Sequence, residues 1–214
     1  MSDLIDISII IPVYNAEKYI KNCLKSLLTQ DFKGTFEIIL VDDASTDNTK
    51  NEIEKYNIPF LNFFPLKVNA GQSAARNLGI KKAKGIFFYF MDIDDTIEKS
   101  SLSTLHNLAI KKDCDLVFSD FKRFESGKNQ RNNIFNYSED KFFDSKELLN
   151  SMQNELYDHN PLFGHLGLFG CNARLIKSSV IHKNKIIFEE DLRMMEDKAF
   201  GWDILGFVKN AYYV

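Results

Sequence analysis

The sequence has few of the features that define several large classes of protein. It contains only three cysteines, Cys23, Cys114 and Cys171, with no C-x-x-C pair and no histidine at ligand spacing, so neither a disulfide framework nor a zinc site is expected. No apolar run approaches the ~20 residues that span a bilayer, and the first residues lack the positive charge of a signal peptide. These absences favour a cytoplasmic location, with any membrane contact peripheral and on the inner face of the membrane.

The chain also lacks an excess of basic residues. Its 27 Lys and Arg are outnumbered by 30 Asp and Glu, and the formal net charge is −3. This balance argues against a nucleic-acid partner, because such partners are bound largely by neutralising phosphates. Basic clusters occur at residues 81–84 and 174–185, and either cluster fits a solvated surface or a contact with anionic lipid.

What the chain has is enough apolar and aromatic sequence, 44% and 13% of 214 residues, for one compact domain. Apolar runs at 7–11, 36–41, 60–64, 86–91 and 115–121 predict buried strands. Helical periodicity separates them, beginning after Asn15, a candidate N-cap, and at residues 47–56, 74–84 and 102–109. Regular alternation of this kind predicts an α/β fold, with a mainly parallel, doubly wound sheet flanked by helices.

The second part of the chain is less regular. Residues 125–140 are polar and poorly periodic, residues 145–157 predict a helix, and residues 160–170 form a loop rich in glycine and aromatic residues. We therefore expect residues 1–121 to form the ligand-binding half of a single domain, and residues 122–214 to form a smaller region that shapes the substrate.

The most informative segment is residues 85–95, an apolar run that stops at three carboxylates, Asp92, Asp94 and Asp95. Ligands of open α/β sheets bind beyond the carboxyl ends of the strands, so these carboxylates suggest a divalent metal, Mg²⁺ or Mn²⁺, holding a phosphate. If the segment stood alone, a solvated acidic turn would be the favoured explanation. Polar residues also follow two other predicted strands, at 12–15 and 42–43, and the three strand ends together favour a nucleotide site.

Five segments carry a resemblance to a known family. They are SIIIPVYN at 8–15, VDDASTD at 41–47, NAGQSAARN at 69–77, DIDD at 92–95 and MED at 195–197. Their order and identity resemble the family 2 inverting glycosyltransferases, which have the GT-A fold. The resemblance covers nearly the whole chain, and no single segment would suffice to suggest it.

The resemblance implies a UDP-sugar donor and a set of residues that bind it. The donor-binding candidates are Pro12, Tyr14, Asp42, Asn69, Gly71, Arg76 and Asp92. Tyr14 can stack on the base, and Asp42 can accept a hydrogen bond from uracil N3–H. Asp94 is the expected ligand of the metal, which offsets the charge of the departing UDP. Arg76 either supplies positive charge near the donor or forms a salt bridge that holds the acidic loop.

In the family the aspartate of the E-D pair is the base that removes the proton of the acceptor hydroxyl, which here is Asp197. Glu196 is a supporting or acceptor-side candidate. The acidic pair could instead simply complement the dipole of a helix that starts there. The expected acceptor is a glycan or lipid-linked glycan, and by analogy the product is a bacterial surface polysaccharide. Similar proteins usually continue beyond the segment equivalent to 211–214, so a C-terminal truncation is expected.

Three alternatives compete with this interpretation. Residues 91–96 also fit the strand end of a haloacid-dehalogenase-type phosphatase, with Asp92 as nucleophile and Asp94 as acid and base. That motif normally lies on the first strand of its domain, whereas here three strands precede it. A sugar-1-phosphate nucleotidyltransferase would need a Gly-rich, Arg-containing loop after the first strand, which is absent. A UDP-sugar-binding module without turnover is the non-enzymatic alternative, and donor hydrolysis would distinguish it.

Overall fold

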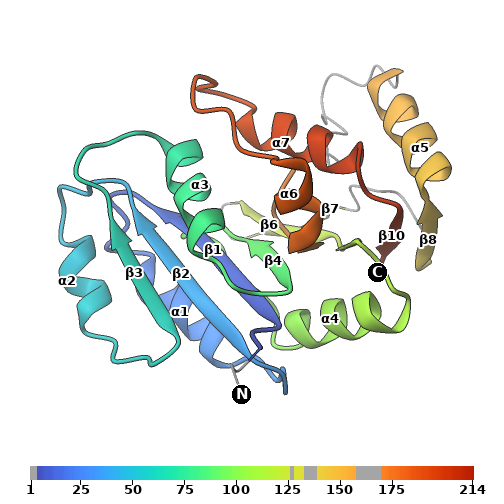
Figure 1. The fold of residues 1–214 in the computed structure, drawn as a ribbon. Helices are drawn as coiled ribbons and strands as arrows, with labels where there is room; N and C mark the ends of the chain where they lie inside the picture. Colours follow the sequence, from blue (N-terminus) through green and yellow to red (C-terminus); the bar gives the residue numbers. More distant parts are fainter. Residues whose placement is uncertain (1–3, 126–127, 133–138, 158–169) are drawn as a thin grey trace.

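The structure, a computed structural model, describes residues 4–125, 128–132, 139–157 and 170–214 (Figure 1). Its centre is an eight-stranded sheet in the order β3-β2-β1-β4-β9-β5-β10-β8. The strands are β1 (Ile7–Val13), β2 (Phe36–Asp42), β3 (Leu61–Pro65), β4 (Phe87–Phe90), β5 (Leu116–Phe118), β8 (Lys141–Asp144), β9 (Arg174–Lys177) and β10 (Asn210–Tyr213). The α/β fold with a mainly parallel sheet is confirmed.

The first four strands of the sheet, β3, β2, β1 and β4, are parallel, and their ends lie within one or two residues of those predicted from the sequence. β1 pairs with β2 and with β4, and β2 pairs with β3. Each inner strand is buried on both faces, which explains why β1, β2 and β4 read as continuous apolar runs rather than as alternating ones. Consequently the carboxyl ends of β2, β1 and β4 lie side by side, as the functional prediction requires.

Helices cover both faces of the sheet (Figure 1). One face packs against α1 (Ile20–Leu28), α2 (Thr49–Glu54) and α4 (Ser101–Lys111). The other face packs against α3 (Gln72–Lys82), α5 (Ser145–Tyr157), α6 (Ser178–Asn184) and α7 (Glu196–Leu205). No helix in the described part of the chain combines the length and apolar character needed to cross a bilayer.

Two features of the second half differ from the sequence prediction. The predicted strand at 115–121 is interrupted at residues 119–120, and the chain continues as a separate hairpin of β6 (Phe121–Glu125) and β7 (Lys128–Asn132). In addition, β9 inserts antiparallel between β4 and β5, where no strand was predicted. The helix at 145–157 is confirmed as α5. The predicted loop at 160–170 lies outside the described residues except for Gly170.

The predicted capping role of Asn15 is wrong. Helix α1 begins only at Ile20, and its N-terminal residues receive no side-chain cap. Asn15 has a left-handed backbone, with φ of 48°, and its side-chain oxygen accepts hydrogen bonds from the backbone N–H groups of Thr46 and Asp47. An asparagine tolerates this backbone geometry better than most residues. It therefore ties the loop after β1 to the loop after β2, at the edge where polar residues gather.

Candidate active site

The acidic loop after β4 lies at the centre of this edge. Asp92 is half-buried, whereas Asp94 and Asp95 are exposed. Although the residue as a whole is exposed, partial desolvation of the Asp95 carboxyl group, together with the neighbouring carboxylates of Asp92 and Asp94, raises its pKa to about 6. The carboxylates of Asp92 and Asp94 thus lie close enough to Asp95 to disfavour its charge, which a cation would relieve.

Asp92 is held by three donors, two from helix α3 and one from the segment before β9. Its Oδ1 accepts hydrogen bonds from Gln72 Nε2 at 3.2 Å and Arg76 Nη2 at 2.9 Å, and its Oδ2 accepts one from Asn172 Nδ2 at 2.7 Å. Gln72 and Asn172 were not singled out from the sequence. Neither follows a strand that carries an acidic motif, so only the folded chain reveals that both orient Asp92.

Of the two roles predicted for Arg76, the structure shows the salt bridge that holds the acidic loop. Arg76 is buried, with 2% of its surface exposed, and it pairs with Asp92 and with Glu196, the latter through Nη1 at 3.1 Å. It does not line the cleft described below. The guanidinium therefore links the acidic loop after β4 to the first residue of α7.

A cleft of about 570 Å³ opens beside the acidic loop. It brings together six of the predicted ligand-binding or metal residues, from the carboxyl ends of β1 and β4 and the loop before α3: Pro12, Tyr14, Asn69, Gly71, Asp92 and Asp94. Half of the Tyr14 surface is exposed, so its ring is available to a planar ligand. The side chains of Gln72 and Asp43 also contribute to the wall. This cleft is the candidate nucleotide site.

Asp43 is the most important residue of the cleft that sequence reasoning missed. It is 4% exposed, and its carboxylate accepts hydrogen bonds from the backbone N–H of Ala70 at 2.7 Å and of Gly71 at 2.9 Å. Gly71 has a φ of 95°, a conformation that favours glycine. Asn69 Nδ2 donates in turn to the backbone oxygen of Asp43 at 3.2 Å. Asp43 therefore shapes the segment 69–71.

Asp42, the predicted reader of uracil, does not line the cleft. It is 4% exposed, and its Oδ1 accepts hydrogen bonds from the backbone N–H of Ser45 at 3.2 Å and from the Ser45 hydroxyl. Ser45 Oγ also accepts a hydrogen bond from the backbone N–H of Asn15 at 2.9 Å. The structure thus shows Asp42 buried beneath the site and hydrogen-bonded to Ser45. A direct contact between Asp42 and uracil stays a prediction.

Glu196 and Asp197 occupy the first turn of α7, so the predicted helix start is confirmed. Burial and the adjacent Glu196 carboxylate raise the pKa of Asp197 above its ordinary value, although a hydrogen bond from the Lys198 backbone and the charge of Arg76 oppose the shift. A carboxylate with a raised pKa is a better proton acceptor. Both acidic residues are half-buried, and Asp197 does not line the cleft.

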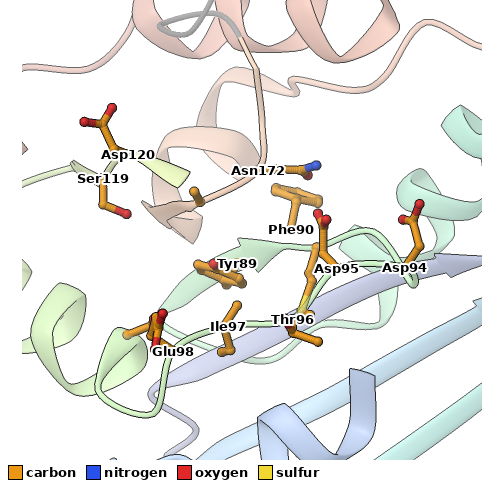
Figure 2. Close-up of a pocket in the computed structure, with 13 residues that line it drawn as sticks. Tyr89, Phe90, Asp94, Asp95, Thr96, Ile97, Glu98, Ser119, Asp120 and Asn172 are labelled. Atoms are coloured by element: carbon orange, nitrogen blue, oxygen red, sulfur yellow. The ribbon is translucent and has the colours of Figure 1, made fainter. Parts of the chain in front are cut away.

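A second cavity of about 700 Å³ adjoins the first and shares Asp94 with it. Figure 2 shows Asp94, Asp95 and Asn172 on one side and Ser119 and Asp120 on the other, with Tyr89 between them. The cavity therefore lies between the end of β4 and the end of β5. Its residues come from both the first and the second part of the chain.

The acidic loop fits a divalent metal of the hard, oxygen-binding type. Asp94 is exposed, and within the described residues its carboxylate makes no hydrogen bond or ion pair. No group of three or more His, Cys, Asp or Glu side chains in the described ranges is arranged to hold a metal alone. A metal at Asp94 would thus take further oxygen ligands from a diphosphate and water, which is how Mg²⁺ is commonly bound beside phosphates.

These features, a doubly wound sheet with carboxylates at its central strand end and a cleft beside them, are typical of α/β proteins that bind nucleotides. The sequence matches Glycosyl transferase family 2 over residues 8–183, and the chain belongs to this family. Its fold is accordingly the GT-A fold, as the resemblance implied.

Similar proteins agree with this assignment. The chain is 31% identical over 208 residues to the poly(ribitol-phosphate) beta-N-acetylglucosaminyltransferase TarP of Staphylococcus aureus strain N315, covering 95% of this chain and 58% of TarP. It is 33% identical over 198 residues to the poly(ribitol-phosphate) beta-glucosyltransferase of Bacillus spizizenii, covering 91% and 28%. The crystal structure of S. aureus TarS 1–349 in complex with UDP-GlcNAc superposes with a TM-score of 0.81 at 29% identity, covering 98% of this chain and 56% of that one. The chain thus spans between about a quarter and three fifths of the length of these relatives.

Proposed function

We propose that this chain is the catalytic domain of a metal-dependent inverting glycosyltransferase, which moves a sugar from a UDP-sugar to a hydroxyl of a glycan acceptor. The observation that carries the proposal is the convergence of four loops on one cleft at the acidic loop after β4, with the acidic start of α7 linked to it through Arg76. A donor-binding cleft, a carboxylate for a metal and a carboxylate for a proton are the parts that this reaction needs.

In this proposal the UDP-sugar lies in the cleft. Tyr14 stacks on the base, the segment 69–71 meets the nucleotide, and Asp94 would be the residue that holds Mg²⁺ or Mn²⁺. When bound, the metal supplies positive charge that stabilises UDP as the leaving group. TarS, a structural neighbour, has been crystallised with UDP and with UDP-GlcNAc, which supports a uridine donor for this chain.

Asp197 then acts as the general base. It removes the proton of the acceptor hydroxyl while that oxygen attacks the anomeric carbon from the side opposite UDP, so the configuration at this carbon inverts. The second cavity, which adjoins Asp94, is where we place the approach of the acceptor. Residues 1–121 are thus the donor-binding half of a single domain, and residues 122–214 are the acceptor-binding half.

The relatives suggest the class of acceptor. TarP and the B. spizizenii protein are named for transfer to poly(ribitol phosphate), so we infer a glycan or lipid-linked glycan of the bacterial surface as the acceptor. The three free, buried thiols fit a reducing cytoplasm, and an acceptor attached to lipid would bring the enzyme to the inner face of the membrane. Membership of family 2 leaves the phosphatase alternative without support.

The test is ligand-dependent stabilisation followed by donor hydrolysis. UDP with Mn²⁺ should raise the melting temperature, and the rise should grow with ligand concentration, whereas UDP with EDTA should raise it much less. UDP-GlcNAc, UDP-glucose and UDP-galactose are then screened for Mn²⁺-dependent release of UDP. Equal stabilisation with and without EDTA would contradict the metal at Asp94. Stabilisation without release of UDP from any donor would favour a binding module over an enzyme.

A further inference from the structure

Arg76 forms two ion pairs whose role is explained neither by donor binding nor by proton transfer. Its guanidinium connects two carboxylates that are far apart in sequence, Asp92 in the acidic loop and Glu196 at the start of α7. The Arg76 side chain is only 3% exposed, and those of Asp92 and Glu196 are 30% and 14% exposed, so water screens the two ion pairs less than it screens pairs at the surface. Removing one partner from such a buried pair leaves a charge uncompensated.

Helix α3 holds the segment before α7 at several further points. The Arg76 guanidinium carbon lies 5.1 Å from the centroid of the Phe188 ring, and that ring stacks on Phe200 of α7 at 3.7 Å. The neighbouring Asn77 donates to the backbone oxygen of Phe188 and accepts from its backbone N–H, both at 2.8 Å. The start of α7 is thus fixed by contacts with α3, a helix of the donor-binding half.

The backbone itself shows why the start of α7 needs such support. Met195, the residue before Glu196, has a φ of 64°, an uncommon and costly conformation for a residue other than glycine. Its side chain is 52% exposed, so packing of that side chain does little to hold it. Its backbone oxygen accepts hydrogen bonds from the N–H groups of Lys198 and Ala199. The first turn of α7 therefore depends on interactions made by its neighbours, and the ion pair of Glu196 with Arg76 is one of them.

We propose that Arg76 and Glu196 are positioning residues that hold Asp197 in a fixed relation to the acidic loop. Arg76 donates hydrogen bonds from Nη2 to Asp92 and from Nη1 to Glu196. One rigid, planar group therefore sets the spacing between the acidic loop after β4 and the first turn of α7, which carries Asp197. The inference rests on the proposed role of Asp197. It assigns to Glu196 an action through Asp197 rather than a contact with the acceptor.

The first test is a double-mutant cycle with UDP release from UDP-GlcNAc in the presence of Mn²⁺ as the readout. Glu196→Ala should lower kcat by about 10²-fold, the cost of a base misplaced by about 1 Å, while KM for the donor changes less than about 2-fold. Glu196→Gln, whose amide oxygen still accepts from Arg76, should recover much of that loss. Glu189→Gln is the matched control, because Glu189 is an exposed carboxylate of the same segment without a hydrogen bond in the described residues.

The double-mutant cycle shows whether Glu196 affects turnover through Asp197 or independently of it. In an Asp197→Asn background, adding Glu196→Ala should cost almost nothing further, since a missing base cannot be misplaced. A loss that persists undiminished in that background would overturn the proposal, and so would a rise in donor KM as large as the fall in kcat. Full activity of Asp197→Asn alone is a different outcome, because it would contradict the proposed base itself, and with it the positioning of that base.

A second readout does not require turnover. In the ligand-free protein, Glu196→Ala should speed amide hydrogen exchange at Lys198 and Ala199, whose N–H groups bond to Met195, by about tenfold or more. Glu189→Gln should leave their exchange unchanged. Unchanged exchange in Glu196→Ala would show that Glu196 does not hold the first turn of α7, and would overturn the proposal regardless of activity.

Discussion

Replacing Asp43 with asparagine should destabilise the fold and weaken donor binding together. The buried carboxylate accepts two backbone hydrogen bonds, from Ala70 and Gly71, and hydrogen bonds to a charged acceptor are each worth about 1.5–3 kcal/mol. The amide keeps one oxygen, which accepts a weaker, neutral hydrogen bond, and turns an NH₂ group toward the other N–H. Because the segment 69–71 is partly exposed and water can replace some of the loss, we expect a decrease of about 2–3 kcal/mol in the free energy of unfolding.

Urea unfolding and a titration with UDP and Mn²⁺ measure the two effects. A loss of 2–3 kcal/mol corresponds to a melting temperature lower by about 4–12 °C in a protein of this size. UDP affinity should fall by at least about tenfold, since the displaced segment forms a wall of the cleft. Asp203→Asn, at an exposed position of α7, is the control and should stay within about 0.5 kcal/mol of the unsubstituted protein. Unchanged stability and UDP affinity in Asp43→Asn would refute the role assigned to this carboxylate.

Three further substitutions test the site. Asp197→Asn should lower sugar transfer by roughly 10²–10⁴-fold and leave the affinity for UDP and Mn²⁺ nearly unchanged in a calorimetric titration. Asp94→Asn should lower both the transfer rate and this affinity, and equal losses of affinity in the two variants would contradict the division of roles. Asp42→Asn should weaken UDP about tenfold more than CDP, because uracil N3–H loses its acceptor, and equal weakening would show that Asp42 does not read the base. The pKa of Asp95 is raised from 3.8 to about 6, so its ionisation destabilises the metal-free fold increasingly as the pH rises from 3.8 to about 6, and fully above that. Asp95→Asn should therefore raise the free energy of unfolding in urea clearly more at pH 7.5 than at pH 4, and an equal effect at both would contradict this.

The first half of the fold could be predicted from the sequence because its signals are local. Strands β1, β2 and β4 are buried on both faces and read as apolar runs, and the helices between them show helical periodicity. Strand β9 could not be predicted in the same way. Its four residues form a strand only because β4 and β5 supply antiparallel partners about 55 to 90 positions away in the chain. Short strands that depend on distant partners leave little trace in a local pattern.

The candidate site shows the same division. Pro12, Tyr14 and Asp94 could be placed because they follow recognisable strands, whose order brings them to one cleft. Asp43 was missed because its partners are backbone N–H groups, which no side-chain pattern marks. Asn172 was missed because it follows no predicted element, although it donates the shortest hydrogen bond to Asp92. Side chains that act by orienting other groups can be identified only once the fold is known.

The most direct test of the central claim is the configuration of the sugar that leaves UDP. The protein is incubated with UDP-GlcNAc and Mg²⁺, which unlike Mn²⁺ does not broaden the spectrum, and the first GlcNAc released to water is followed by proton NMR before the anomers equilibrate. Since the donor is α-linked and Asp197 is proposed to activate a hydroxyl on the face opposite UDP, the account predicts that β-GlcNAc appears first and that EDTA abolishes its formation. Initial release of α-GlcNAc, or release that EDTA does not affect, would contradict a metal-dependent inverting glycosyltransferase.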